Sequence, residues 1–138
     1  MGRSQTLGKI AENNVAKILR FYGRAVAVQR HQSPYDLLVE GERVEVKCAD
    51  MRMENGMPFW TFNIHRHGVM SEETDFYIFR LEHVPFSKYP IHLLFRAPLN
   101  THVACVSFRS LLSRDAIAVV DFYRFARGEL SRTTPMAA

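Results

Sequence analysis

The chain has 138 residues, which is enough for one domain with a buried core. Hydrophobic residues make up 47% of it and charged residues 23%, as in ordinary globular domains, and the formal net charge of +4 favours a polyanionic partner. No stretch approaches the roughly 18 apolar residues that span a bilayer, and the first residues lack the apolar core of a signal peptide. We therefore expect a soluble intracellular protein, cytoplasmic or nucleoid-associated, with no membrane partner.

The two cysteines, Cys48 and Cys105, lie in apolar runs that read as strands. We expect both to pack as small hydrophobic side chains rather than to form a disulfide. No CxxC motif or Cys/His cluster accompanies them, so the sequence offers no zinc site.

Residues 4–22 form the first predicted element, an amphipathic helix. Apolar side chains recur at helical spacing, and Gly23 stands where a C-terminal cap belongs. Glu12 faces either a cleft or solvent, in the second case beside Lys9 or Lys17. Five basic residues on this helix and at its ends suit contact with DNA phosphates, although a solvated basic face is the default interpretation: Arg3, Lys9, Lys17, Arg20 and Arg24.

A β-hairpin is predicted next, from the apolar run 37–39 and the alternating run 44–48. Successive side chains of a strand point to opposite faces, so Glu45 and Lys47 share one face. Asp36 begins the neighbouring strand. We therefore expect its carboxylate close to Glu45 across the hairpin.

Two carboxylates and a lysine at one end of a sheet suit a hard divalent cation. Mg²⁺ keeps several waters, so one or two carboxylates such as Asp36 and Glu45 are enough to bind it. Lys47 could position an attacking water or balance charge on a phosphate. The same residues also fit a solvated strand face, with Asp36 capping a turn after Pro34, and spacing alone favours this second interpretation.

The rest of the chain alternates strands and turns before a closing helix. The helix is predicted over 109–127, broken near Ser113, with Ser107 or Ser110 as its N-cap. Residues 1–128 are expected to form a single domain and 129–138 a flexible tail. Runs rich in strand formers predict the remaining strands at 24–30, 59–64, 75–81, 91–96 and 103–108.

The hairpin also resembles a known family. Asp36 followed by Glu45-Val46-Lys47 is similar to the core of the PD-(D/E)XK nucleases, the restriction-endonuclease-like fold. Pro34 stands for the proline of the motif, with Tyr35 inserted before the aspartate. The likeness covers roughly residues 8–80, and the order of helix, strand and hairpin agrees along it.

Two further positions extend the resemblance. Glu12 matches the acidic residue that the family often carries on its first helix. Ser33 resembles the serine that precedes the aspartate in archaeal-type Holliday junction resolvases. The resemblance implies an α/β fold whose mixed central sheet is flanked by helices.

The resemblance further implies an Mg²⁺-dependent DNA endonuclease, in which Mn²⁺ can substitute. Asp36, Glu45 and the Val46 carbonyl would hold the metal. Lys47 would orient the water or stabilise the phosphate, and Glu12 would act through a second metal or a bound water. Residues expected to contact DNA are Lys9, Arg30, Ser33, His65 and Arg66; metal binding by His65 and His67 is the less favoured alternative, since no third soft ligand is near in sequence.

The substrate and the assembly remain open at this level. A core this small usually reads DNA as a homodimer or higher oligomer, which places two active sites on two strands. The enzyme would be either structure-selective, like a junction resolvase, or site-specific, like a homing or restriction endonuclease. The alternative is a non-catalytic DNA-binding or assembly protein on the same fold, and a third reading is a protein-interaction module whose Phe-rich strands bury a partner.

Overall fold

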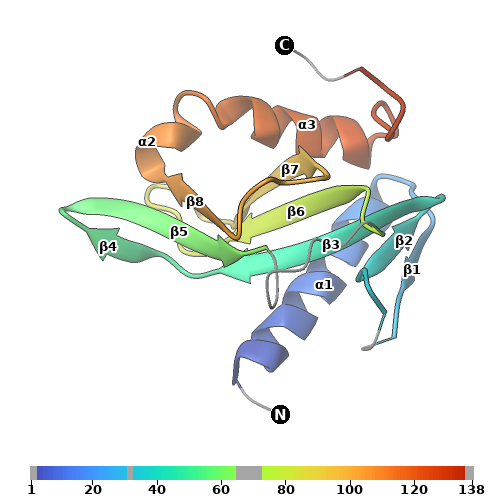
Figure 1. The fold of residues 1–138 in the computed structure, drawn as a ribbon, viewed down its shortest axis with the longest axis horizontal. Helices are drawn as coiled ribbons and strands as arrows, with labels where there is room; N and C mark the ends of the chain where they lie inside the picture. Colours follow the sequence, from blue (N-terminus) through green and yellow to red (C-terminus); the bar gives the residue numbers. More distant parts are fainter. Residues whose placement is uncertain (1–2, 31–32, 65–72, 136–138) are drawn as a thin grey trace.

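A computed structural model describes residues 3–30, 33–64 and 73–135 of the chain (Figure 1). It contains three helices and eight strands within these ranges. The elements are α1 (Arg3–Phe21), β1 (Val26–Val28), β2 (Leu37–Val39), β3 (Glu42–Ala49), β4 (Arg52–Glu54), β5 (Met57–Asn63), β6 (Phe76–Leu81), β7 (Ile91–Arg96), β8 (Val103–Ser107), α2 (Phe108–Leu111) and α3 (Ala116–Ala126).

The central sheet is mixed. Its five strands lie in the order β1-β2-β3-β6-β7, with β3 and β6 parallel and the other neighbours antiparallel. A second sheet has the order β4-β5-β8 and is entirely antiparallel. The mixed central sheet flanked by helices confirms the predicted fold class. The second sheet was not expected, because its pairing of β5 with β8 joins segments about 45 residues apart.

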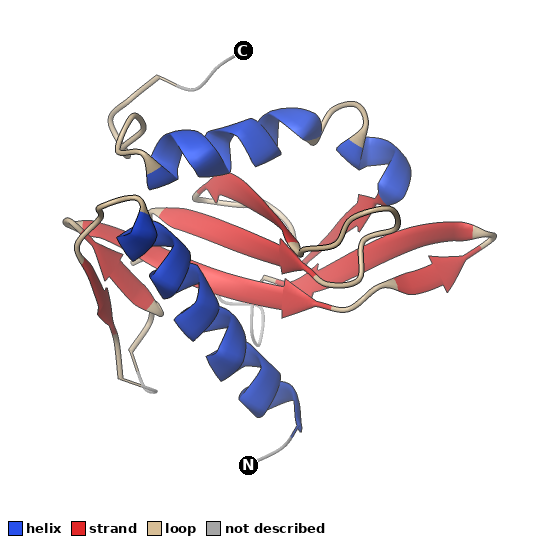
Figure 2. Cartoon of the chain, turned by 180° about the vertical axis from the view of Figure 1, so that it is seen from behind, coloured by secondary structure: helices blue, strands red, loops and turns tan. Residues whose placement is uncertain are grey.

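Strand alternation divides the buried side chains between the two faces of the central sheet. Figure 2 shows α1 lying obliquely across one face. That face packs on α1 and the end of α3 through Ala11, Val15, Leu19, Val44, Val46, Ile78, Leu94, Phe122 and Phe125. The opposite face packs on the second sheet through Tyr77, Phe79, Leu93, Trp60, Phe62 and Val106, so two of the aromatic residues of β5 belong to the core.

The residues that end α1 and begin α2 are those that the sequence predicted. Gly23 follows α1 with a φ of +91°, a conformation that favours glycine, and the Arg24 N–H donates to the Leu19 carbonyl at 3.0 Å. Ser107 caps α2 in a reciprocal capping box with Ser110. No helix within the described ranges is long and apolar enough to cross a bilayer.

The segment after α3 differs from the expected flexible tail. Leu130 is only 1% exposed and belongs to the same core cluster as the buried residues of α1 and α3. The Arg96 guanidinium donates to the Ser131 carbonyl at 2.7 Å, and the Arg132 N–H donates to Glu42 at 3.1 Å. The segment is therefore fixed to the domain up to residue 135, while 136–138 lie outside the described residues. The sequence did not predict this attachment, because the contacts are made by a single leucine and by backbone groups.

Candidate active site

The hairpin holds Asp36 against the backbone of β3. The paired register of β2 and β3 ends at Leu37 and Val44, so Asp36 is the next residue beyond it on one strand and Glu45 the next residue on the other. The Asp36 N–H donates to the Val44 carbonyl at 2.9 Å, and the Asp36 carboxylate accepts from the Val46 N–H at 2.7 Å. These two bonds fix both the backbone and the side chain of Asp36 at the start of β2.

Glu45 and Lys47 point to the same face of β3, as the alternation predicted. The Lys47 Nζ lies 3.2 Å from the Glu45 Oε1, and the two side chains are only 22% and 19% exposed. Such shielding is unlike a freely solvated strand face. On the neighbouring strand Glu45 pairs in register with Tyr77, whose pKa is raised by burial and by the Glu45 charge.

Glu12 extends the acidic group from α1. It lies within hydrogen-bonding reach of Asp36, and its Oε2 is 4.0 Å from the Lys9 Nζ. Burial raises the pKa of Asp36 to about 7; the Val46 N–H opposes this, the Glu12 charge adds to it, and Lys47 lowers it. Glu12 therefore pairs with Lys9 of its own helix, as one interpretation expected, and also lies next to Asp36.

The donor atoms in this region are hard oxygens. Within the described part of the chain no three or more His, Cys, Asp and Glu side chains form a ready metal cluster. Asp36 and Glu12 offer carboxylate oxygens side by side, Glu45 offers another on β3 beside Lys47, and further positions are left to backbone carbonyls and water. That donor set fits Mg²⁺, which retains waters, and does not fit zinc.

The predicted DNA-contact residues are only partly placed. Arg30 is exposed and Ser33 half-buried on the connection from β1 to β2, where the Ser33 N–H donates to the Arg30 carbonyl at 2.9 Å. Since the Gln29 N–H also donates to the Asp36 carbonyl at 2.8 Å, both ends of this connection lie near the candidate site. His65 and Arg66 lie outside the described residues.

Comparison with known proteins supports the fold. Neither the protein-family models nor the curated proteins contain a match to this sequence. The chain is similar in structure to a bacterial homing endonuclease, I-Ssp6803I. The two are 18% identical, with a TM-score of 0.59 over 77% of this chain and 76% of that one. A likeness at this identity shows the fold, which is an endonuclease-like α/β fold.

A polar pair on the central strands was not predicted from the sequence. Arg80 of β6 lies opposite His92 of β7, and the Arg80 Nη1 stands 3.2 Å from the His92 Nε2. Both strands are apolar runs in the sequence. The signal that could have revealed the pair was one polar residue in each run, Arg80 in the first and His92 in the second. The pair lies on the face of the sheet that packs on α1 and the end of α3.

Proposed function

We propose that this chain is a metal-dependent DNA endonuclease that hydrolyses phosphodiester bonds. The observation that supports the proposal is the hairpin itself, which carries Asp36, Glu45 and Lys47 at the end of its paired register, with Glu12 of α1 next to Asp36. The fold that holds them is similar to that of a homing endonuclease. Substrate choice, between a junction and a specific sequence, is set by contacts outside these four side chains.

Each side chain has a role that its position supports. Asp36, oriented by the Val46 N–H, and Glu45 would hold Mg²⁺ or Mn²⁺, with the Val46 carbonyl as a further ligand. When bound, the metal lowers the pKa of water and offsets negative charge on the phosphate. Lys47, held by Glu45 at 3.2 Å, would orient the water or a phosphate oxygen, and Glu12 would hold a second water.

DNA would approach across the basic residues near this site. Lys9 is exposed beside Glu12, and Arg30 and Ser33 flank the connection that leads to Asp36. His65 and Arg66 complete the proposed contacts. A homodimer or higher oligomer would present two such sites to the two strands.

A second candidate is a DNA-binding or assembly protein that has no catalysis. It is favoured by the contact between Lys47 and Glu45, since a lysine that neutralises a carboxylate at 3.2 Å also suits a purely structural ion pair. Such a protein would bind DNA without a metal ion. It would be indifferent to Lys47→Ala.

The deciding experiment compares cleavage of plasmid, single-stranded and four-way-junction DNA with and without Mg²⁺. Lys47→Ala is the test variant, and Lys88→Ala, in the loop between β6 and β7, is the matched control. The proposal expects metal-dependent cutting that Lys88→Ala keeps and Lys47→Ala loses. Metal-independent DNA binding with no cutting of any substrate would favour the second candidate, and cutting that survives Lys47→Ala would reject the assigned site.

A further inference from the structure

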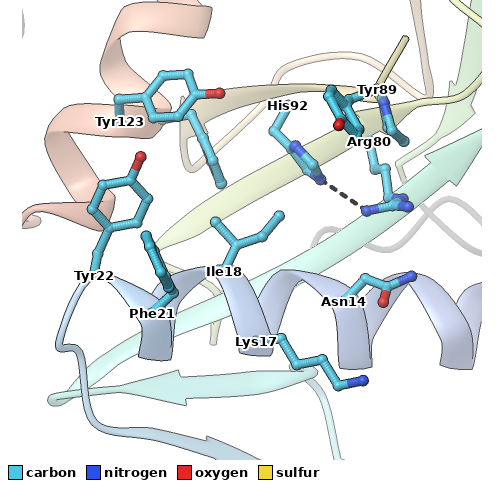
Figure 3. Close-up of a pocket in the computed structure, with 11 residues that line it drawn as sticks. Asn14, Lys17, Ile18, Phe21, Tyr22, Arg80, Tyr89, His92 and Tyr123 are labelled. Atoms are coloured by element: carbon cyan, nitrogen blue, oxygen red, sulfur yellow. Dashed lines mark hydrogen bonds between the residues drawn. The ribbon is translucent and has the colours of Figure 1, made fainter.

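A pocket of about 570 Å³ opens between α1 and α3, above the polar pair of β6 and β7. Its size lies within the range of about 300–1,000 Å³ for small-molecule sites. Figure 3 shows Phe21, Tyr22 and Tyr123 gathered at one end of it, and Arg80 and Tyr89 at the other. The pocket therefore has an aromatic end and a cationic end.

The aromatic end is a continuous row of rings. Neighbouring ring centroids are 5.6 Å apart for Phe21 and Tyr22, 6.3 Å for Tyr22 and Tyr123, 5.4 Å for Tyr123 and Phe122, and 4.8 Å for Phe122 and His92. Phe21, Tyr22 and Tyr123 are 86%, 40% and 41% exposed. Aromatic side chains gathered at the surface commonly mark a binding site, and their open ring faces can stack on a planar ligand.

The cationic end carries a fixed guanidinium and an exposed ammonium. Arg80 donates to His92 at 3.2 Å and to Glu82 at 2.7 Å, which holds the guanidinium at the floor of the pocket. Burial, with the Arg80 charge, lowers the pKa of His92 to about 3, so the imidazole accepts this bond in its neutral form. Lys17 is exposed at the rim and pairs with no carboxylate among the described residues, so it supplies positive charge that Glu82 does not cancel.

The pocket is separate from the candidate active site. Asn14, Lys17, Ile18 and Phe21 have the i, i+3, i+4, i+7 spacing of one helix face, and that face lines the pocket. Glu12 lies about 200° around the helix from Asn14 and turns to the hairpin instead. One face of α1 therefore lines the pocket, and another face carries Glu12 toward the candidate active site.

We propose that this pocket binds one nucleotide whose base is unpaired. The base would stack on the face of Tyr123 and meet Tyr22, whose ring is inclined by 68° to that of Tyr123, along its edge. The phosphate would lie toward Arg80 and Lys17. A base offers two π faces whatever its identity, while a phosphate accepts hydrogen bonds from a guanidinium and an ammonium. The source favoured by the positive net charge of the chain is a single-stranded segment of nucleic acid. The proposal does not require the nuclease function, because no active-site residue lines the pocket.

The test uses the whole protein in EDTA, so that no cleavage occurs. NMR titration compares deoxyadenosine monophosphate with deoxyadenosine and with inorganic phosphate, following the amides of Tyr123 and His92. We expect the nucleotide to bind about tenfold more tightly than either fragment. Fluorescence anisotropy then compares a short single strand, the same strand made fully abasic, and a duplex; the intact single strand should bind best.

Surface variants locate the binding. Tyr123→Ala should weaken nucleotide binding at least about fivefold and Tyr123→Phe should keep it, since the ring rather than the hydroxyl makes the contact. Lys17→Ala should reduce the preference for the nucleotide over the nucleoside. Phe86→Ala removes a fully exposed aromatic ring that does not line the pocket, and it should change nothing.

Three results would overturn the assignment. They are equal affinity for the nucleotide and inorganic phosphate, binding untouched by both Tyr123→Ala and Lys17→Ala, and equal losses in Tyr123→Ala and Phe86→Ala. Melting curves for each variant separate lost binding from lost folding. Binding of the mononucleotide without preference for the intact strand over the abasic one would support nucleotide recognition and reject the nucleic-acid source.

Discussion

Replacing Asp36 by asparagine should stabilise the metal-free protein at pH 8. The carboxylate is largely shielded from water and lies beside Glu12, and these effects raise its pKa from 3.8 to about 7. A shift of about three units corresponds to about 4 kcal/mol against the charged form, from about 1.4 kcal/mol per unit. The amide that Asp36→Asn introduces can still accept from the Val46 N–H, though less strongly than a charged oxygen does. We therefore expect a net gain of about 2 kcal/mol after that loss.

The sign follows from the direction of the shift. A carboxyl group whose folded-state pKa lies above its unfolded-state pKa destabilises the fold when it ionises. For Asp36 this cost is absent below about pH 4 and complete above about pH 7. The advantage of Asp36→Asn should thus be largest at pH 8 and disappear near pH 4.

The assay is urea or thermal denaturation in EDTA at pH 8 and pH 4. A gain of about 2 kcal/mol should raise Tm by about 6 °C for a domain of this size. Adding Mg²⁺ at pH 8 should then stabilise the wild-type protein and leave the variant unchanged, because the ion binds only the intact carboxylate pair. A variant that is less stable than wild type at pH 8 in EDTA would refute the reasoning about this site.

Three other predictions concern the rest of the fold. The first uses the Asp36→Asn background, in which the opposing titration of Asp36 is absent. The free energy of unfolding should fall as the pH drops from about 6.5 toward 3, by up to about 1.4 kcal/mol per pH unit, because His92 is neutral when folded and protonates on unfolding. Urea midpoints that stay flat from pH 7 to 5 would contradict this. Asp75→Asn should cost about 1–3 kcal/mol at pH 7, because Asp75 accepts from the Arg43 backbone and guanidinium. Burial alone would raise the pKa of Asp75, but these bonds lower it. The stability lost in Asp75→Asn should therefore vanish as the wild-type protein is acidified through that lowered pKa. A loss of stability that stays constant down to pH 2 would contradict this prediction. Leu130→Ala should cost about 2–5 kcal/mol by chemical denaturation, and a loss below about 0.5 kcal/mol would mean that the segment is not part of the core.

Local patterns in the sequence were sufficient for the elements around the candidate site. The helical spacing of α1, the alternation of β3 and the serine that caps α2 are each set by residues a few positions apart, and the structure confirms all three. The bonds from Asp36 to the backbone of Val44 and Val46 belong to the same short hairpin. These features depend on local geometry, which periodicity and turn chemistry report directly.

Features that depend on distant pairing were not visible in the sequence. Arg80 meets His92 only because β6 and β7 pair in one register, and their pocket exists only because α1 and α3 lie on the same face. Leu130 belongs to the core although no apolar period surrounds it. The contact of Glu12 with Asp36 could be suspected from the family resemblance, but spacing alone left it open.

The most direct test of the central claim is the single-turnover rate of DNA cleavage in Mg²⁺ by wild type and by Lys47→Ala, with DNA affinity measured in parallel. If Lys47 acts on the attacking water or the phosphate, the rate should fall by about a hundredfold or more while the affinity changes little. An equal rate in the two proteins, or cleavage that persists in EDTA, would contradict the account.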